Sequence, residues 1–127
     1  MGLCITTGAK LAFVAASSFT LTWTHTVQKT EWQEDWAIVD GARLQLTAAR
    51  VKGSGAGMEP PPDALRDGGW WHYRPDVPPL SALDLADHGG EAGRWRLCAA
   101  SACRDLASDD GAIAIRACSA PPFSTAP

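Results

Sequence analysis

Residues able to carry chemistry are concentrated in the stretch from Trp23 to Trp36. Side chains alternate between the two faces of an extended strand, which places His25 and Lys29 on the same face as Trp23. An imidazole and an ammonium group beside indole rings could hold a small anion. These residue types therefore make an anion site one hypothesis for this face.

Three interpretations of this face are open, because charged groups on an apolar strand face must be paired. In the first, which the sequence favours, the charges form a structural network in which Lys29 pairs with Glu34. In the second, the face binds a ligand, and the site comprises Trp23, His25, Lys29, Thr30, Glu34, Trp36 and Arg50. In the third, His25 is catalytic, but such a site needs a nucleophile and an orienting acid. Threonine is a poor nucleophile without a base, so we expect no catalytic residues.

A glycine-rich loop follows, with Gly53, Gly55 and Gly57 at every second position. The loop lacks the Gly-Lys-Ser/Thr ending of a phosphate-binding loop, and the prolines after it exclude a helix there. A structural crossover loop is the preferred interpretation, and cradling of an anion by its backbone amides is the alternative. His72 and His88 have no metal-ligand spacing with any Asp or Cys, so we expect no metal and no cofactor.

Four cysteines lie at positions 4, 98, 103 and 118. A hairpin would place Cys98 directly opposite Cys103, close to disulfide geometry, and closing so short a loop contributes about 2 kcal/mol. We expect this disulfide, with free thiols as the alternative. Cys4 and Cys118 can pair only if the two ends of the chain meet, and the sequence leaves that open.

Short alternating segments must position these residues, and helical periodicity is scarce. The clearest strand is Phe19–Val27, where large apolar residues alternate with threonines. Further strands are expected at about 3–6, 11–15, 34–39, 43–51, 70–74, 80–85, 94–98 and 103–106. About seven to nine short strands predict an all-β fold, a small and mostly antiparallel β-sandwich or barrel. We expect a single β-domain over 1–106 and a C-terminal extension over 107–127, with an extra strand at 112–118 left open and a frayed proline-rich tail.

The Asp40-Gly41 pair marks a hairpin turn. Hydrophobic matching places Ile38 opposite Leu44 and Trp36 opposite Leu46, which a plain two-residue turn would not do. We therefore expect a bulge or a three-residue loop here, and we expect Leu44, Leu46 and Ala48 to share one face.

Composition limits the class of protein. The chain has 127 residues, 46% of them hydrophobic, and includes six Trp that can serve as core material. The net charge of −3 disfavours nucleic acid as a partner, and no apolar run is long enough to span a membrane. The disulfide favours an extracytoplasmic, periplasmic location with the export signal absent from this chain, and a cytoplasmic location is the alternative.

Residues 19–36 resemble the core motif of domain-of-unknown-function family 1850, and residues 46–50 and 53–58 resemble its second motif. The late stretch from Arg96 to Cys103 also fits the family, and the resemblance covers about residues 3–106. The chain departs from the family motif at Thr26, where serine is expected, and at Gln28, where an acid is expected. The missing acid at position 28 weakens the case for a fixed carboxylate beside Lys29. The resemblance implies a bacterial or archaeal protein, often exported or membrane-anchored, and often encoded beside tripartite ATP-independent periplasmic (TRAP) transporters with TAXI-type receptors.

From the resemblance we expect a non-enzymatic accessory or binding protein of a TRAP/TAXI-type solute-uptake system, with the transporter receptor or permease as its partner. An independent small-anion-binding module that uses the His25/Lys29 region is the alternative. A hydrolase is the third and weakest hypothesis. The sequence leaves the oligomeric state open.

Overall fold

The computed structural model describes residues 2–24, 31–40, 42–52, 65–67, 69–86, 95–108 and 110–119. All regular structure in this part of the chain is β. The strands are β1 (Gly2–Thr7), β2 (Lys10–Val14), β3 (Ser18–Thr24), β4 (Glu31–Val39), β5 (Arg43–Lys52), β6 (Leu65–Asp67), β7 (Trp70–Tyr73), β8 (Leu83–Ala86), β9 (Trp95–Ala99), β10 (Ala102–Leu106) and β11 (Ala112–Cys118). The expected all-β class is confirmed, with eleven strands in the described residues rather than seven to nine. No helix in the described residues is long and apolar enough to cross a membrane.

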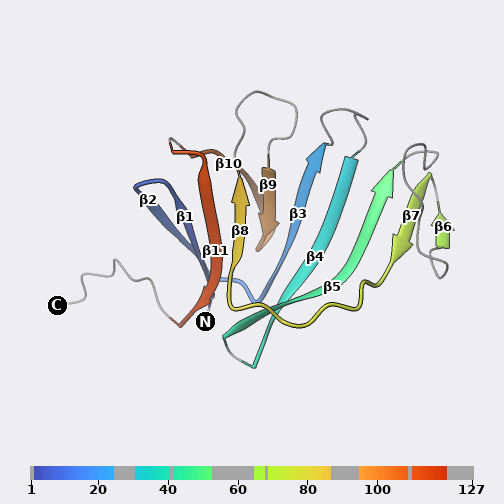
Figure 1. Ribbon diagram of the computed structural model, residues 1–127, viewed down its shortest axis with the longest axis horizontal. Coiled ribbons are helices and arrows are strands. Elements are labelled where there is room, and N and C mark those ends of the chain that lie inside the picture. Colours follow the sequence, from blue (N-terminus) through green and yellow to red (C-terminus); the bar gives the residue numbers. More distant parts are fainter. Residues whose placement is uncertain are drawn as a thin grey trace.

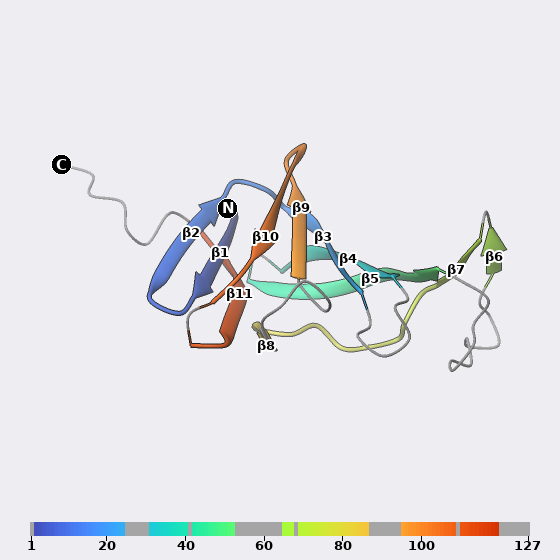
Figure 2. The same ribbon diagram turned by 90° about the horizontal axis from the view of Figure 1, so that it is seen from above.

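The strands form two antiparallel sheets (Figure 1). The smaller sheet has the order β2-β1-β11-β8, and the larger has the order β10-β9-β3-β4-β5-β7-β6. The far end of the larger sheet, at β7 and β6, lies away from the smaller sheet in both views (Figures 1 and 2). Among the described strands neither sheet closes on itself, so the fold fits the expected β-sandwich rather than the expected barrel.

The core lies between the two sheets and is built from alternate apolar residues of their inner faces. Its buried members are Leu3, Ile5, Phe19, Leu21, Trp36, Leu44, Leu46, Leu83, Leu97, Leu106, Ile113 and Ile115. Burial of such side chains is the main favourable contribution to folding. Strand β11 supplies Ile113 and Ile115 and lies between β1 and β8. Residues 112–118 are therefore an internal part of the packed structure.

The turn between β4 and β5 follows the expected hydrophobic matching. Val39 pairs with Arg43, which leaves a three-residue loop, and Ile38 pairs with Leu44. Asp40 in this loop has a positive φ of 54°, a backbone region that Asp tolerates better than most residues. The expected three-residue loop is confirmed.

A β-bulge lies farther along the same pair of strands and changes which residues of β5 face the core. Trp36 pairs with Leu46 but Asp35 pairs with Ala48, so Thr47 has no residue opposite it in the register with β4. Its Oγ1 donates to the backbone oxygen of Asp35 at 3.0 Å. Beyond this extra residue the buried positions are Ala49 and Val51 instead of the even-numbered ones. The expectation that Ala48 shares the face of Leu44 and Leu46 is therefore wrong.

Both pairs of cysteines form disulfides. Cys98 and Cys103 are direct partners across β9 and β10, as expected. Cys4 bonds to Cys118, with 5.9 Å between their Cα atoms, because β1 and β11 are neighbours in the smaller sheet. The question that the sequence left open is answered by this pairing of the first and last described strands.

Candidate functional site

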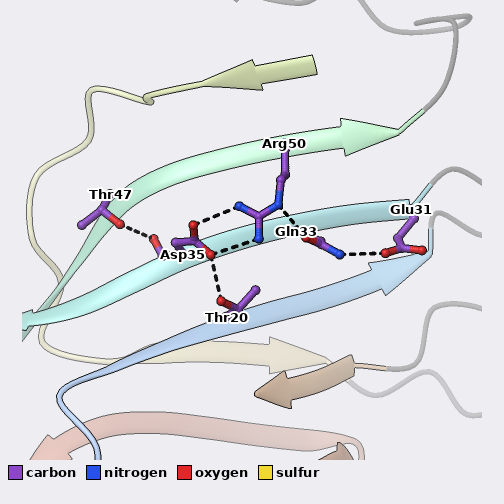
Figure 3. Close-up of polar contacts among 6 residues, drawn as sticks. All are labelled: Thr20, Glu31, Gln33, Asp35, Thr47 and Arg50. Carbon is purple, nitrogen blue, oxygen red and sulfur yellow. Dashed lines mark hydrogen bonds and ion pairs between the residues drawn. The ribbon is translucent and has the colours of Figure 1, made fainter. Parts of the chain in front are cut away.

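The outer face of the larger sheet carries a connected row of polar side chains on three neighbouring strands (Figure 3). Thr20 on β3 lies opposite Asp35 on β4, and Gln33 on β4 lies opposite Arg50 on β5. The residues next to them in sequence, such as Leu21 and Trp36, point into the core. Arg50 joins the outer row because the bulge at Thr47 changes the parity of β5.

The side chains of this row are joined by hydrogen bonds. Arg50 binds Asp35 with a two-pronged fork, in which Nη1 donates to Oδ2 at 2.9 Å and Nη2 donates to Oδ1 at 3.3 Å. Thr20 Oγ1 donates to Asp35 Oδ1 at 2.8 Å, and Arg50 Nε donates to Gln33 Oε1 at 2.5 Å. Gln33 Nε2 donates in turn to Glu31 Oε2 at 2.8 Å. We call Thr20, Gln33, Asp35 and Arg50 the outer polar row.

The electrostatics of the row keep Asp35 ionised. Burial by itself would raise the pKa of Asp35, but hydrogen bonds from Arg50 and Thr20 and the positive charge of Arg50 together hold it below its ordinary value. The two charged side chains are 23% (Arg50) and 36% (Asp35) exposed, so solvent screens the pair only in part. At neutral pH the row is therefore a fixed carboxylate–guanidinium pair and not a proton-transfer site.

A polar hollow lies over this row. Its volume is about 540 Å³, and its lining includes Ser18, Thr20, Asp35, Thr47, Arg50 and Cys98. This volume lies within the range that accommodates small molecules or a protruding side chain of another protein. A guanidinium group carries five N–H donors, and the bonds to Asp35 and Gln33 use three of them. Arg50 can therefore bind a carbonyl or carboxylate oxygen in the hollow without giving up Asp35.

Three residues of the expected ligand site lie on the opposite, core-facing side of the same strands. Trp23 stacks on Trp32 at 5.9 Å between ring centroids and contacts Trp95 at 4.7 Å with the two rings tilted by 42°. Trp36 is 5% exposed, and its Nε1 donates to Glu34 Oε1 at 3.2 Å. The structure thus brings the two Trp of the expected site and Glu34 to one face of the sheet.

Glu34 differs from Asp35 in its electrostatics. Burial raises the pKa of Glu34 above its ordinary value, and the hydrogen bond from Trp36 offsets only part of that rise. Burial and the nearby charge of Glu34 also raise the pKa of Tyr73 on β7. This face therefore holds an acid that is easier to protonate than usual.

The structure places Arg50 apart from the other described members of the expected set. It lies on the outer face, whereas Glu34 faces inward, so the expectation that these two residues converge is wrong. The physical reason is the bulge at Thr47, which turns Arg50 toward Gln33 and Asp35. The remaining members, His25, Lys29 and Thr30, lie outside the described residues, as do Gly53, Gly55 and Gly57.

Sequence reasoning missed Thr20, Gln33 and Asp35 as site residues. A signal for them was present, because the apolar positions of β5 change from Leu44 and Leu46 to Ala49 and Val51. That change of parity requires one extra residue between positions 46 and 49 and turns Arg50 to the outer face. Within the described part of the chain, no group of three or more His, Cys, Asp and Glu side chains could hold a metal ion.

A family model described as "Domain of unknown function (DUF1850)" matches residues 19–106, which run from β3 to the end of β10. The match includes the outer polar row and the Cys98–Cys103 disulfide and excludes β1, β2 and β11. No curated protein and no solved structure matches the chain.

Proposed function

Since the chain belongs to the DUF1850 family, we propose that it is a non-enzymatic accessory protein that binds a component of a TRAP/TAXI-type solute-uptake system. The transporter receptor or the permease would be the partner. This choice rests on what the resemblance of residues 19–36 implies, and the outer polar row supplies the proposed contact surface.

The observation that supports a binding role is the rigid geometry of the outer polar row. Asp35 and Arg50 hold each other in one orientation, and Thr20 and Gln33 add a hydrogen bond each. A surface that is ordered before association loses less conformational entropy when a partner arrives. Arginine is also frequent among the interface residues that contribute most to binding free energy, and Arg50 has N–H donors that its bonds to Asp35 and Gln33 do not use. The matching group on the partner would be a carboxylate or a backbone carbonyl.

We propose a bacterial, extracytoplasmic location for this role. The chain forms two disulfides, one of which links the first and last described strands. Such bonds persist in oxidising compartments and are rare in the reducing cytoplasm. A periplasmic protein would have direct access to the receptor of an uptake system.

A co-purification experiment under native conditions tests the proposal. The tagged chain is mixed with the purified receptor and, separately, with the detergent-solubilised permease of the same organism. Retention of either partner supports the proposal, and retention of neither overturns it.

The role of the outer polar row is tested by replacing Arg50 with Lys, which keeps the charge but loses the planar fork. We expect the affinity for the retained partner to fall about tenfold, the usual effect of losing a central charged hydrogen bond. Arg116→Lys is the matched control, because Arg116 is exposed on β11 of the smaller sheet. Equal affinities of the two variants would place the partner elsewhere on the molecule.

A further inference from the structure

The two disulfides of the chain lie in opposite surroundings. Cys4 is 0% exposed and belongs to β1, which pairs with β2 on one side and β11 on the other. Cys98 and Cys103 lie on the β9–β10 hairpin, where Cys98 is half-buried and Cys103 is exposed. We infer that the Cys98–Cys103 disulfide is a thiol–disulfide exchange site for an external protein dithiol, whereas Cys4–Cys118 is structural. This inference goes beyond the proposed binding role and does not depend on it.

Exchange at a disulfide requires access to one of its sulfur atoms. A thiolate breaks a disulfide by attacking one sulfur and expelling the other, so it must reach one sulfur from outside. Strand β10 ends the strand order of the larger sheet, and its residues 102–105 are all exposed. Cys103 lies within this exposed run and is the more exposed residue of the pair, so we assign the attack to its sulfur.

The leaving thiolate of this pair belongs to the polar hollow. Attack at Cys103 releases Cys98, which lines the polar hollow together with Thr20 and Arg50. Asp35 balances the charge of Arg50 there. The benefit to a thiolate is therefore the two N–H donors of Arg50 that Asp35 and Gln33 do not use, rather than net positive charge.

The same step at the other disulfide is unfavourable. Cys118 is half-buried, and attack on its sulfur would release the Cys4 thiolate at a position with no exposure. A thiolate that solvent cannot reach is disfavoured, so we expect exchange at this pair to be slow.

The β9–β10 hairpin is held by more than its disulfide. Cys98–Cys103 closes a loop with a sequence separation of 5, and Cys4–Cys118 closes one with a separation of 114. The stabilisation that the chain-entropy model assigns to a disulfide grows with the length of the loop, so it is smaller for the short loop than for the long one. Strands β9 and β10 stay paired through their backbones, and Leu97 and Leu106 anchor them in the core. Reduction of Cys98–Cys103 therefore leaves the two thiols side by side, ready to be oxidised again.

The proposed reaction is a transfer of two electrons from a dithiol. A thiolate of the external dithiol attacks Cys103 Sγ, the Cys98–Cys103 bond breaks, and Cys98 leaves as a thiolate that takes up a proton. The second thiol of the dithiol loses its proton and attacks the mixed disulfide, which releases Cys103 as a thiolate that is then protonated. The products are two cysteine thiols on this chain and one disulfide on the donor.

Graded reduction of the native protein is the first experiment. The protein is incubated with dithiothreitol without denaturant, quenched with an alkylating reagent at successive times, and mapped by peptide mass spectrometry. We expect Cys98 and Cys103 to be alkylated at least about tenfold faster than Cys4 and Cys118. Equal rates, or faster loss of Cys4–Cys118, would overturn the inference.

A trapping experiment tests which sulfur is attacked. Thioredoxin that lacks its resolving cysteine forms a stable mixed disulfide with the sulfur it attacks. We expect the trapped peptide to contain Cys103, and a double variant, Cys98→Ala with Cys103→Ala, to form no adduct while keeping the Cys4–Cys118 bond. Trapping at Cys98 or Cys118, or no adduct with the unaltered protein, would contradict the inference.

Discussion

Glu34 and Asp35 are adjacent acids on β4, yet the two faces of the sheet give them opposite properties. Asp35 faces outward, where Arg50 and Thr20 bind it and lower its pKa. Glu34 faces inward beside Trp36, and burial raises its pKa. The direction in which the pKa of a carboxyl group shifts in this sheet therefore depends on the face that the group occupies. It does not depend on how many charged residues lie nearby in the sequence.

The β-bulge at Thr47 decides which acid receives the arginine. The extra residue places Arg50 opposite Gln33, on the face of Asp35, and places the buried Ala49 opposite Glu34. Because of this one extra residue, Asp35 on the outer face has Arg50 as its ion-pair partner, whereas Glu34 on the inner face does not.

The largest expected effect comes from removing the inner partner of Glu34. Trp36→Ala deletes a side chain that is 5% exposed and stacked on Phe19 at 6.4 Å. We expect the free energy of unfolding to fall by about 3–5 kcal/mol, because a large cavity opens in the core. Urea denaturation monitored by circular dichroism measures the loss. A loss below about 1 kcal/mol would mean that the inner face is not the packed side of β4.

Amide replacements of the two acids are expected to change stability in opposite directions at pH 7. Asp35→Asn weakens the fork with Arg50 and lowers the free energy of unfolding by about 1 kcal/mol, a value reduced for the exposure of the pair. Glu34→Gln removes a charge that burial disfavours and raises stability by a few tenths of a kcal/mol, roughly up to 1 kcal/mol. Urea denaturation of both variants beside the unaltered protein measures the two signs. Changes of the same sign would remove the distinction between the faces.

The pH dependence of stability is expected to separate the same two residues. The folded pKa of Asp35 is lowered, so its contribution is complete above its unfolded pKa and is lost as pH falls through its folded pKa. The folded pKa of Glu34 is raised, so its unfavourable contribution is complete above that folded pKa and disappears as pH falls below its unfolded pKa.

The advantage of Glu34→Gln should therefore vanish at a higher pH than the disadvantage of Asp35→Asn. Denaturation curves collected from neutral to acidic pH for the three proteins provide the test. The reverse order of disappearance would contradict the assigned directions of the two pKa values.

The smallest expected effect is on Tyr73, the one tyrosine of the chain. The charge of Glu34 contributes to the raised pKa of this phenol, second to burial. Glu34→Gln should therefore lower the pKa of Tyr73, and Asp35→Asn, on the opposite face, should leave it unchanged. Alkaline titration followed by phenolate absorbance reports this residue alone. A shift of the same size in Asp35→Asn would show that the sheet does not separate the two acids.

The alternation of apolar and polar residues along the sequence was enough to predict much of the fold. The threonines and apolar residues of Phe19–Val27 predicted β3, and matching of Ile38 with Leu44 predicted the three-residue turn. The bulge at Thr47 was harder to place, because Ala48 and Ala49 are both small and apolar and either can occupy an inner position. The error in the facing of Arg50 follows from that ambiguity. The Cys4–Cys118 bond depends on the pairing of β1 with β11, which no local pattern specifies.

The Cys4–Cys118 bond also makes the backbone from residue 4 to residue 118 a covalent ring. The ring encloses the whole segment that the family model matches, residues 19–106. A protease that cuts any one peptide bond inside it opens the ring but releases no fragment, so the nicked molecule keeps its mass, apart from one added water, until it is reduced. New chain ends could be made in the connection between β4 and β5, residues 40–42, while the two original end strands stay bound to each other.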